Sequence, residues 1–227
     1  MTLKSVKVPE VFSPLFEKAE QFVSEYFNRM NQDPTQGTIT IGDERYVLVR
    51  AESLSVHFLE FVKGMYPAMN EIEAMAGTGT VLFDLAHSIG KGDARAFFKK
   101  LDVADPIARL SAGPIHFAYT GWAFVDILPQ SKAVPNDEYY LLYDHPFSFE
   151  ADSWIQKKVK TDFCICFMNA GYSSGWCSES FGLELTAKEI MCRARGDNAC
   201  RFIMAPQNRI DEYVENYLAG ISAVEGQ

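Results

Sequence analysis

The sequence lacks the features of several classes of protein. No stretch of its 227 residues approaches the roughly 20 continuous apolar residues that a membrane-spanning helix needs. The first ten residues, MTLKSVKVPE, lack the apolar segment of a secretory signal peptide, so we expect a cytoplasmic protein. Basic residues are scarce, since 21 Lys and Arg stand against 30 Asp and Glu, for a net charge of -9. This balance disfavours direct binding to nucleic acid or to an anionic membrane, because both need a basic face.

Cysteine is absent before position 164, and all five cysteines fall in the last third of the chain. Because their number is odd and no secretion signal precedes them, a metal site or free thiols is expected rather than a disulfide framework. Fingerprints for nicotinamide, flavin or nucleotide are also missing. The Gly-Thr-Gly-Thr run at 77–80 lacks the following Lys and Ser/Thr of a phosphate loop, so it predicts close packing between helices.

The pattern of apolar residues predicts an α+β fold, in which an antiparallel sheet is packed with helices. Helices are predicted at 11–31, 51–65, 70–87, 93–101, 105–112, 160–181 and 208–218, and a further helix begins at about 151. Gly77 and Gly79 are expected to break the helix at 70–87, and Gly113-Pro114 is expected to end the helix at 105–112. Strands are predicted at 115–128, 138–143, 184–192 and 200–204, with a hairpin at 38–50 around Gly42-Asp43 and an irregular turn at 144–150.

Three segments are expected along the chain. Residues 1–35 hold an N-terminal amphipathic helix that we expect at a dimer contact. Residues 36–205 form the main domain, with a compact cysteine-bearing unit at about 145–205. Residues 206–227 form a C-terminal helix.

The cysteines predict a closed metal site. Cys192 and Cys200 lie at the two ends of a predicted turn, so their thiols can converge. Glu189 reaches the same point only if the strand is locally irregular, because in a flat strand it would face the opposite side from Cys192. A fourth ligand must come from Cys164, Cys166 or Cys177, and spacing alone does not choose among them. Three thiolates and one carboxylate satisfy a tetrahedral zinc ion and leave no open position, which indicates a structural site. The alternative is a set of buried free cysteines.

Four motifs carry a resemblance to known families. The segments NAGYSSGWCSESFG (169–182) and KEIMCRARGDNAC (188–200) resemble the 4-vinyl-reductase domain. The segments AGPIHF (112–117) and FSFEADSW (147–154) resemble the XylR-type N-terminal sensor region of bacterial enhancer-binding activators that respond to phenols and other aromatics. The resemblance covers nearly the whole chain from about residue 35. It implies the fold shared by nitric-oxide-signalling and Golgi-transport proteins, with a zinc-anchored helix–hairpin unit.

The resemblance also implies the ligands of the structural zinc. The family pattern of one Cys, one Glu and two further Cys falls without gaps on Cys166, Glu189, Cys192 and Cys200. It therefore selects Cys166 as the fourth ligand.

The resemblance further implies a ligand pocket beside the zinc. In the phenol sensors a histidine after the AGP motif and a tryptophan before the SFE motif hold the phenolic hydroxyl. An ungapped alignment places Phe117 and His145 at these two positions, with His116 one residue away. On a strand, a one-residue shift turns a side chain to the other face. The other expected pocket residues are Trp176, Tyr119, Trp122, Phe147, Ala170 and Ala187.

A sensing function follows from the resemblance. It implies a homodimeric regulatory module, not an enzyme, that binds a small hydrophobic or aromatic molecule. The C-terminal helix around Tyr213 and Tyr217 would pass the signal to an output domain, in cis or in trans, that controls transcription. Two alternatives stay open at this point. One is a tetrapyrrole-related vinyl reductase or its accessory, and the other is a scaffold that holds an acyl chain, as in vesicle-tethering subunits.

Overall fold

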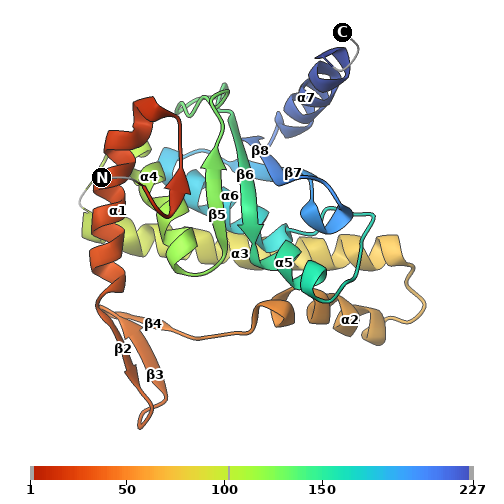
Figure 1. Ribbon diagram of the computed structural model, residues 1–227, viewed down its shortest axis with the longest axis horizontal. Helices are drawn as coiled ribbons and strands as arrows, with labels where there is room; N and C mark the ends of the chain where they lie inside the picture. The colour runs from red at the N-terminus through yellow and green to blue at the C-terminus, as the bar shows by residue number, and fades with distance from the viewer. Residues whose placement is uncertain (1–2, 102, 225–227) are drawn as a thin grey trace.

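A computed structural model describes residues 3–101 and 103–224, and it confirms the predicted α+β architecture (Figure 1). The main sheet has the strand order β1-β5-β6-β8-β7. Strand β1 pairs parallel with β5, and the other neighbours pair antiparallel. The strands of this sheet are β1 (Val6–Lys7), β5 (Ala123–Ile127), β6 (Leu141–Ser148), β7 (Leu185–Met191) and β8 (Cys200–Pro206). A second antiparallel sheet consists of β2 (Met30–Asp33), β3 (Thr38–Ile41) and β4 (Glu44–Tyr46).

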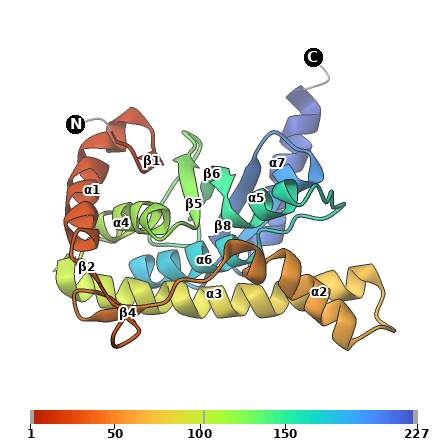
Figure 2. The same cartoon turned by 60° about the horizontal axis from the view of Figure 1, so that its bottom comes forward.

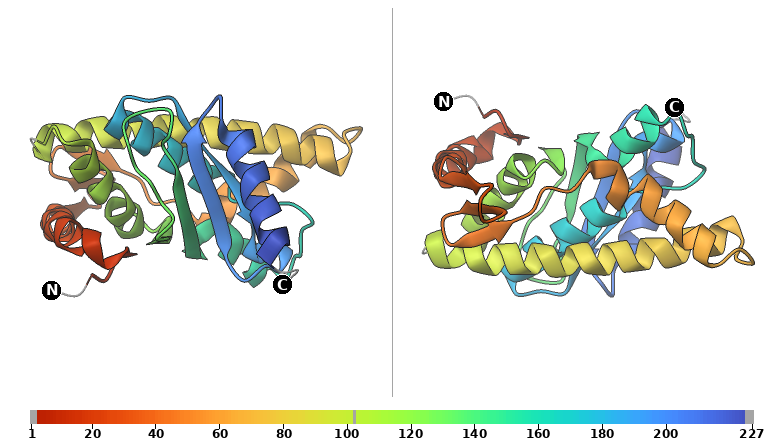
Figure 3. Two further views of the ribbon diagram at one scale, coloured as in Figure 1. Left: turned by 90° about the horizontal axis from the view of Figure 1, so that it is seen from above. Right: turned by 90° about the horizontal axis from the view of Figure 1, so that it is seen from below.

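Helices cover both faces of the main sheet (Figures 2 and 3). The α-helices are α1 (Ser13–Phe27), α2 (Val56–Met65), α3 (Glu71–Leu101), α4 (Pro106–Tyr119), α5 (Phe149–Gln156), α6 (Phe167–Phe181) and α7 (Ile210–Val224), and short 3-10 turns lie at Glu10–Phe12, Ala51–Leu54 and Arg193–Arg195. Helices α3, α4 and α6 lie on one face and share the large core. Helix α7 lies on the opposite face, where Ile210 packs with Leu142 and Ile203. None of the helices in the described residues is long and apolar enough to cross a membrane.

Helices α3 and α6 cross at very close range because glycines line the crossing. A Cβ added at Gly171 would lie 2.2 Å from the carbonyl oxygen of Phe83. One added at Gly90 would lie 2.3 Å from the carbonyl oxygen of Tyr172. Such distances are shorter than any van der Waals contact, so only glycine permits this backbone approach.

Several predicted elements have different bounds in the structure. Helix α1 ends at Phe27 rather than at 31, because residues 30–33 pair with β3 as strand β2. The predicted hairpin at 38–50 is confirmed in its turn, with Gly42 at a φ of 63°, but it ends at Tyr46. The helix predicted at 51–65 is confirmed only from Val56, as α2, because residues 51–54 form a separate 3-10 turn.

The prediction of two helices at 70–87 and 93–101 is wrong, since one 31-residue helix spans both. Gly77 and Gly79 do not break it. Gly79 allows close packing, as predicted, because a Cβ there would lie 2.7 Å from the ring of Phe167. Gly77 is exposed and has nothing near it.

The predicted helix stop at Gly113-Pro114 and the predicted strand from 115 are also wrong. Helix α4 continues through Pro114 to Tyr119, and the strand begins only at Ala123. His116 and Phe117 therefore lie on a helix, where successive side chains diverge by about 100° rather than pointing to opposite faces.

The remaining corrections concern residues 144–166 and the C-terminal helix. Residues 144–148, predicted as an irregular turn, belong to β6, which pairs with β8 as far as His145. The long helix predicted at 160–181 begins only at Phe167, because Glu150 caps the first turn of α6. The Glu150 carboxylate accepts hydrogen bonds from the backbone N–H groups of Met168 (3.0 Å) and Asn169 (2.9 Å). The C-terminal helix, predicted at 208–218, begins at Ile210.

Candidate functional site

The structure brings the four predicted metal ligands together. The donor atoms of Cys166, Glu189, Cys192 and Cys200 all lie within 4.8 Å of one another, an arrangement that could hold a metal ion. The Sγ atoms of Cys166 and Cys200 are 3.7 Å apart. Cys177, a candidate ligand by spacing, is not part of this cluster and lines the small cavity described below.

Local backbone irregularities produce this convergence. Cys166 lies at the N-cap of α6, where the chain turns into the helix. In β7 the pairing register shifts between Glu189 and Met191, which confirms the predicted irregularity and turns the Glu189 side chain to the side of Cys192. Asp197 then closes the following turn, because its Oδ2 accepts hydrogen bonds from Cys192 N (2.7 Å) and Arg195 Nε (2.9 Å).

The electrostatics of the cluster fit a cation. Hydrogen bonds from the thiols of Cys166 and Cys200 lower the pKa of Cys192, which favours its thiolate form. Burial raises the pKa of Cys166 and of Glu189. The Oε1 atom of Glu189 is buried and has no hydrogen-bond partner among the described residues, while Oε2 accepts from Cys166 N at 2.9 Å. A metal ion would stabilise several anionic donors and would give the Oε1 atom a partner.

A small cavity lies beside this cluster, between α4, α6 and the sheet. Its volume is about 30 Å³, enough for one or two water molecules but not for an aromatic ring. It is lined by Leu110, Gly113, Pro114, Phe117, Val125, Ile127, Leu141, Tyr143, His145, Tyr172, Ser173, Trp176 and Cys177. Three of the predicted pocket residues, Phe117, His145 and Trp176, thus meet at one cavity.

His145 is the unusual group in this cavity. It is 0% exposed, and within the described part of the chain neither of its ring nitrogens has a hydrogen-bond partner. Aromatic rings surround it, with centroids 4.5 Å away for Phe202, 5.2 Å for Tyr143 and 5.6 Å for Phe117. Burial lowers the pKa of His145 to about 3, so the imidazole is neutral and offers one donor and one acceptor. His145 also pairs with Cys200 across β6 and β8, which places it next to the cysteine cluster.

A second and much larger cavity, about 500 Å³ in volume, lies on the other side of α4. The predicted pocket residues His116, Tyr119 and Trp122 line this cavity rather than the small one. Tyr172 stands between the two cavities. Its ring stacks on Phe117 at a centroid distance of 4.8 Å, and its hydroxyl lies 2.9 Å from His116 Nδ1.

The last three predicted pocket residues lie elsewhere. Phe147 is 65% exposed and lines a shallow groove with Phe124 and Trp122. Ala170 and Ala187 are buried core residues joined through Ser174, whose hydroxyl donates to Ala170 O (2.6 Å) and accepts from Ala187 N (2.8 Å).

Several residues of the site could not be found from sequence patterns. Tyr143 and Phe202 belong to strands, and only the pairing of β6 with β8 places them around His145. Asp93, the first residue of the helix predicted at 93–101, lies inside α3 and accepts a hydrogen bond from the Tyr172 hydroxyl at 2.9 Å.

Comparison with known proteins supports a sensor fold. The chain is 22% identical over 204 residues to the phenol regulator MopR of Acinetobacter guillouiae, an alignment that covers 90% of this chain and 35% of the relative. The chain thus spans about a third of that regulator's length. Among solved structures it is similar to the phenol-responsive sensory domain of the transcription activator PoxR with phenol, with a TM-score of 0.71, 20% identity, and coverage of 93% of this chain and 97% of that chain.

A weaker similarity links the chain to a trafficking protein particle complex subunit 3 from Naegleria fowleri, covalently bound to palmitic acid. The TM-score is 0.47 at 13% identity, with coverage of 69% of this chain and 95% of that chain. No protein-family model matches the chain. The similarities to the two phenol-responsive proteins confirm the resemblance to the XylR-type sensor region, and the resemblance to the 4-vinyl-reductase domain stays a prediction.

Proposed function

We propose that this domain senses a small aromatic molecule that carries a hydrogen-bonding group, and that it thereby regulates transcription through an output domain. The single observation that carries the proposal is His145, a fully buried and neutral imidazole with two unpartnered nitrogens inside a cage of aromatic rings. Buried polar groups without partners are costly, and they are retained where a ligand supplies the partner. The relatives are regulators rather than enzymes.

The small cavity must open to admit such a ligand. Sites for organic ligands are commonly about 300–1,000 Å³, whereas this cavity holds about 30 Å³. We propose that the wall that moves is α6, which contributes Tyr172 and Trp176 to the lining. A ligand that binds only the open form would shift α6, and with it the packing between α6 and α3. Ligand binding is thus coupled to a change in structure, as a sensor requires.

Titration calorimetry with phenol, catechol and toluene tests the proposal. Wild-type protein should bind a phenolic ligand at least about tenfold more tightly than toluene, since only the former offers a hydroxyl to His145. A His145→Phe variant should lose this preference, and a His57→Phe variant, altered at an exposed histidine of α2, should keep it. Equal phenol affinity in wild type and His145→Phe would contradict the assignment.

The cysteine cluster is proposed to hold a structural zinc ion. Cys166, Cys192, Cys200 and Glu189 would supply three thiolates and one carboxylate, a set that suits tetrahedral Zn²⁺ and leaves no open position. Such an ion would fix the start of α6 to the β7–β8 hairpin, next to the ligand cavity. Elemental analysis should find about one zinc per chain. Less than about half an equivalent, in protein purified without chelator, would refute the site.

Dimerisation and the output step belong to the same proposal. Helix α1 is proposed as a dimer contact, and α7 as the connection to an output domain in cis or in trans. We propose a cytoplasmic location for this domain, because an output domain that controls transcription acts there. Hydrogen exchange of residues 205–220, measured with and without bound phenol, tests the role of α7. Identical protection in the two states would exclude it.

A further inference from the structure

The large cavity has the features of a second ligand site, independent of His145. Its walls come from α1, the hairpin of β3 and β4, the following extended segment, α3 and α4. Its volume of about 500 Å³ is within the range of sites for small organic ligands. Apolar side chains such as Phe27, Ile41, Leu85, Ile89 and Phe97 make up much of the wall.

A carboxylate without a cation lies in this apolar wall. Asp93 is partly buried on α3, and its Oδ2 accepts a hydrogen bond from the Tyr172 hydroxyl at 2.9 Å. Tyr172 is oriented in turn by His116 Nδ1, also at 2.9 Å. Burial lowers the pKa of His116 to about 3, so this imidazole is neutral and does not compensate the charge of Asp93. Burial also raises the pKa of Asp93, as expected for a carboxylate that lacks a counter-ion.

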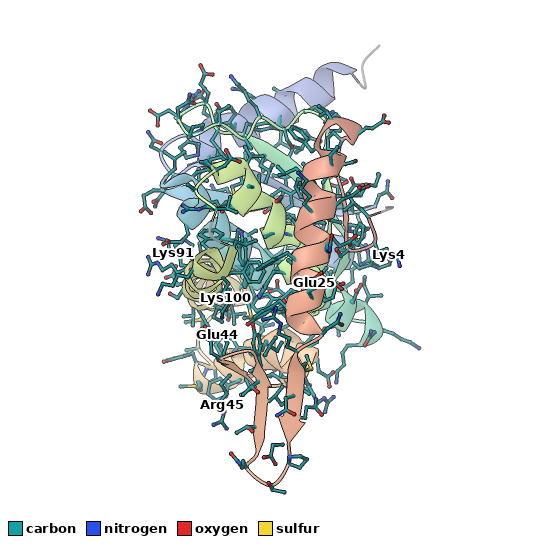
Figure 4. All side chains as sticks on the ribbon, turned by 90° about the vertical axis from the view of Figure 1, so that its left-hand side faces the viewer. Lys4, Glu25, Glu44, Arg45, Lys91 and Lys100 are labelled. Carbon is teal, nitrogen blue, oxygen red and sulfur yellow. The ribbon has the colours of Figure 1, made fainter. Side chains whose placement is uncertain are left out.

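Arg45 and Lys100, the basic residues that line the cavity in the described part of the chain, are engaged elsewhere, and Arg45 Nη2 donates to the carbonyl oxygen of Gly37 at 3.0 Å. Lys100 Nζ lies 2.7 Å from Asp43 and 3.2 Å from Glu44, and Figure 4 shows Lys100 and Glu44 next to each other where the hairpin approaches the end of α3. Across the described residues, no ion pair joins Asp93 to a Lys, Arg or His side chain. Glu44, the second acidic residue of the lining, is paired with Lys100, so Asp93 is the carboxylate of the described lining that lacks an ion pair.

Aromatic rings surround the same end of the cavity. The rings of Phe27 and Phe97 lie 5.3 and 5.4 Å from that of His116, and Phe27 lies 6.4 Å from Tyr46. Tyr46 and Asp93 both line this cavity, and the charge of Asp93 contributes to the raised pKa of Tyr46. A carboxylate with aromatic faces around it is the environment that binds an organic ammonium group, because ring faces attract cations.

We propose that the large cavity binds a small organic amine with a hydrophobic body, whose ammonium group is held by Asp93 among the rings of Phe27, Tyr46 and Phe97. The apolar wall then accepts the body of the ligand. An anionic ligand is disfavoured by the unpaired Asp93, and a neutral ligand leaves that carboxylate uncompensated.

Calorimetry at pH 7 with 2-phenylethylamine, and with its neutral analogue 2-phenylethanol, tests the proposal. Wild-type protein should bind the amine roughly 30-fold or more tightly than the alcohol, as expected for a charge pair in a desolvated pocket. This comparison needs no variant. Equal affinity for the two compounds, or no binding of the amine at millimolar concentration, would overturn the proposal.

Two variants locate the site. Asp93→Asn should lower the affinity for the amine roughly 30-fold or more and leave that for the alcohol unchanged. Asp84→Asn removes the same charge from an exposed position of α3 and should bind the amine like wild type. A His145→Phe variant should also keep amine binding, so failure of the phenolic site and failure of this site are distinguishable. Wild-type amine affinity in Asp93→Asn would refute the assignment.

Discussion

Replacing His145 by leucine should increase the stability of the ligand-free protein. The side chain is fully buried, and its two ring nitrogens have no partner in the described structure. Each unpartnered buried group costs about 1–3 kcal/mol relative to its hydration in the unfolded chain. Leucine has a similar volume, carries no polar atom and contacts the same aromatic rings. We therefore expect His145→Leu to increase the free energy of unfolding, although the substitution lies in the centre of the core.

The expected gain in stability is smaller than the summed cost of the two unpartnered ring nitrogens. Leucine loses the ring contacts with Phe202 and Tyr143, which lie at centroid distances of 4.5 and 5.2 Å, and aromatic pairs contribute about 0.5–1.5 kcal/mol each. The net increase in the free energy of unfolding should be about 1–3 kcal/mol. For a chain of this length, each kcal/mol raises the Tm by about 2–4 °C.

Urea denaturation of ligand-free protein at equal metal content measures this change. His57→Leu serves as the control, because His57 lies at the surface of α2, and its substitution should change stability by no more than about 0.5 kcal/mol. With phenol at about 100 times the wild-type Kd, wild type should gain roughly 2.7 kcal/mol, and His145→Leu, which binds at least about tenfold more weakly, should gain no more than about 1.4 kcal/mol. A loss of stability in His145→Leu would refute the reasoning, since it would mean that the imidazole nitrogens have partners in the free protein.

Two further predictions concern α3 and its neighbours. Gly171→Ala should lower the free energy of unfolding by about 3 kcal/mol or more, because the new Cβ would lie 2.2 Å from Phe83 O and force the helices apart. Gly77→Ala, at an open position of α3, should raise the free energy of unfolding by about 0.5–1 kcal/mol. Thermal unfolding measures both changes, and equal effects of the two substitutions would contradict the close crossing. His116→Asn should reduce the loss of stability in acid. The pKa of His116 is about 3 in the folded protein against about 6.5 in the unfolded chain, so the unfolded chain binds more protons as pH falls below 6.5, and wild type should lose about 2 kcal/mol more than the variant between pH 8 and pH 5. Parallel stability curves in urea titrations over this range would show that His116 does not titrate in this way.

The metal cluster could be predicted from the sequence because its ligands are close together along the chain. Glu189, Cys192 and Cys200 lie on one hairpin, and the resemblance to known motifs added Cys166. The structure confirms that these four side chains converge, and it confirms the strand irregularity that the position of Glu189 required.

The helix bounds were harder to predict because a glycine or a proline can either end a helix or lie inside one, where glycine makes room for close packing. Gly113-Pro114 is a typical helix stop, yet α4 continues through it. A Cβ at Gly113 would lie 2.6 Å from the indole nitrogen of Trp176, so this glycine makes room for a ring that is 63 residues away in sequence. The same is true of Gly79 and Gly90 in α3, whose contacts lie on α6. Local sequence shows that a side chain is missing, but only the tertiary contact shows why.

The change of residues 115–119 from strand to helix alters the meaning of the two candidate residues there. On the helix, Phe117 lines the small cavity beside His145, and His116 lines the large cavity beside Asp93. Tyr172 contacts both, since its ring stacks on Phe117 and its hydroxyl bonds to His116 and Asp93. A ligand that displaces Tyr172 from the small cavity must break these two hydrogen bonds in the large one. Tyr172 therefore connects the two cavities from α6, the helix whose N-cap residue, Cys166, belongs to the cysteine cluster.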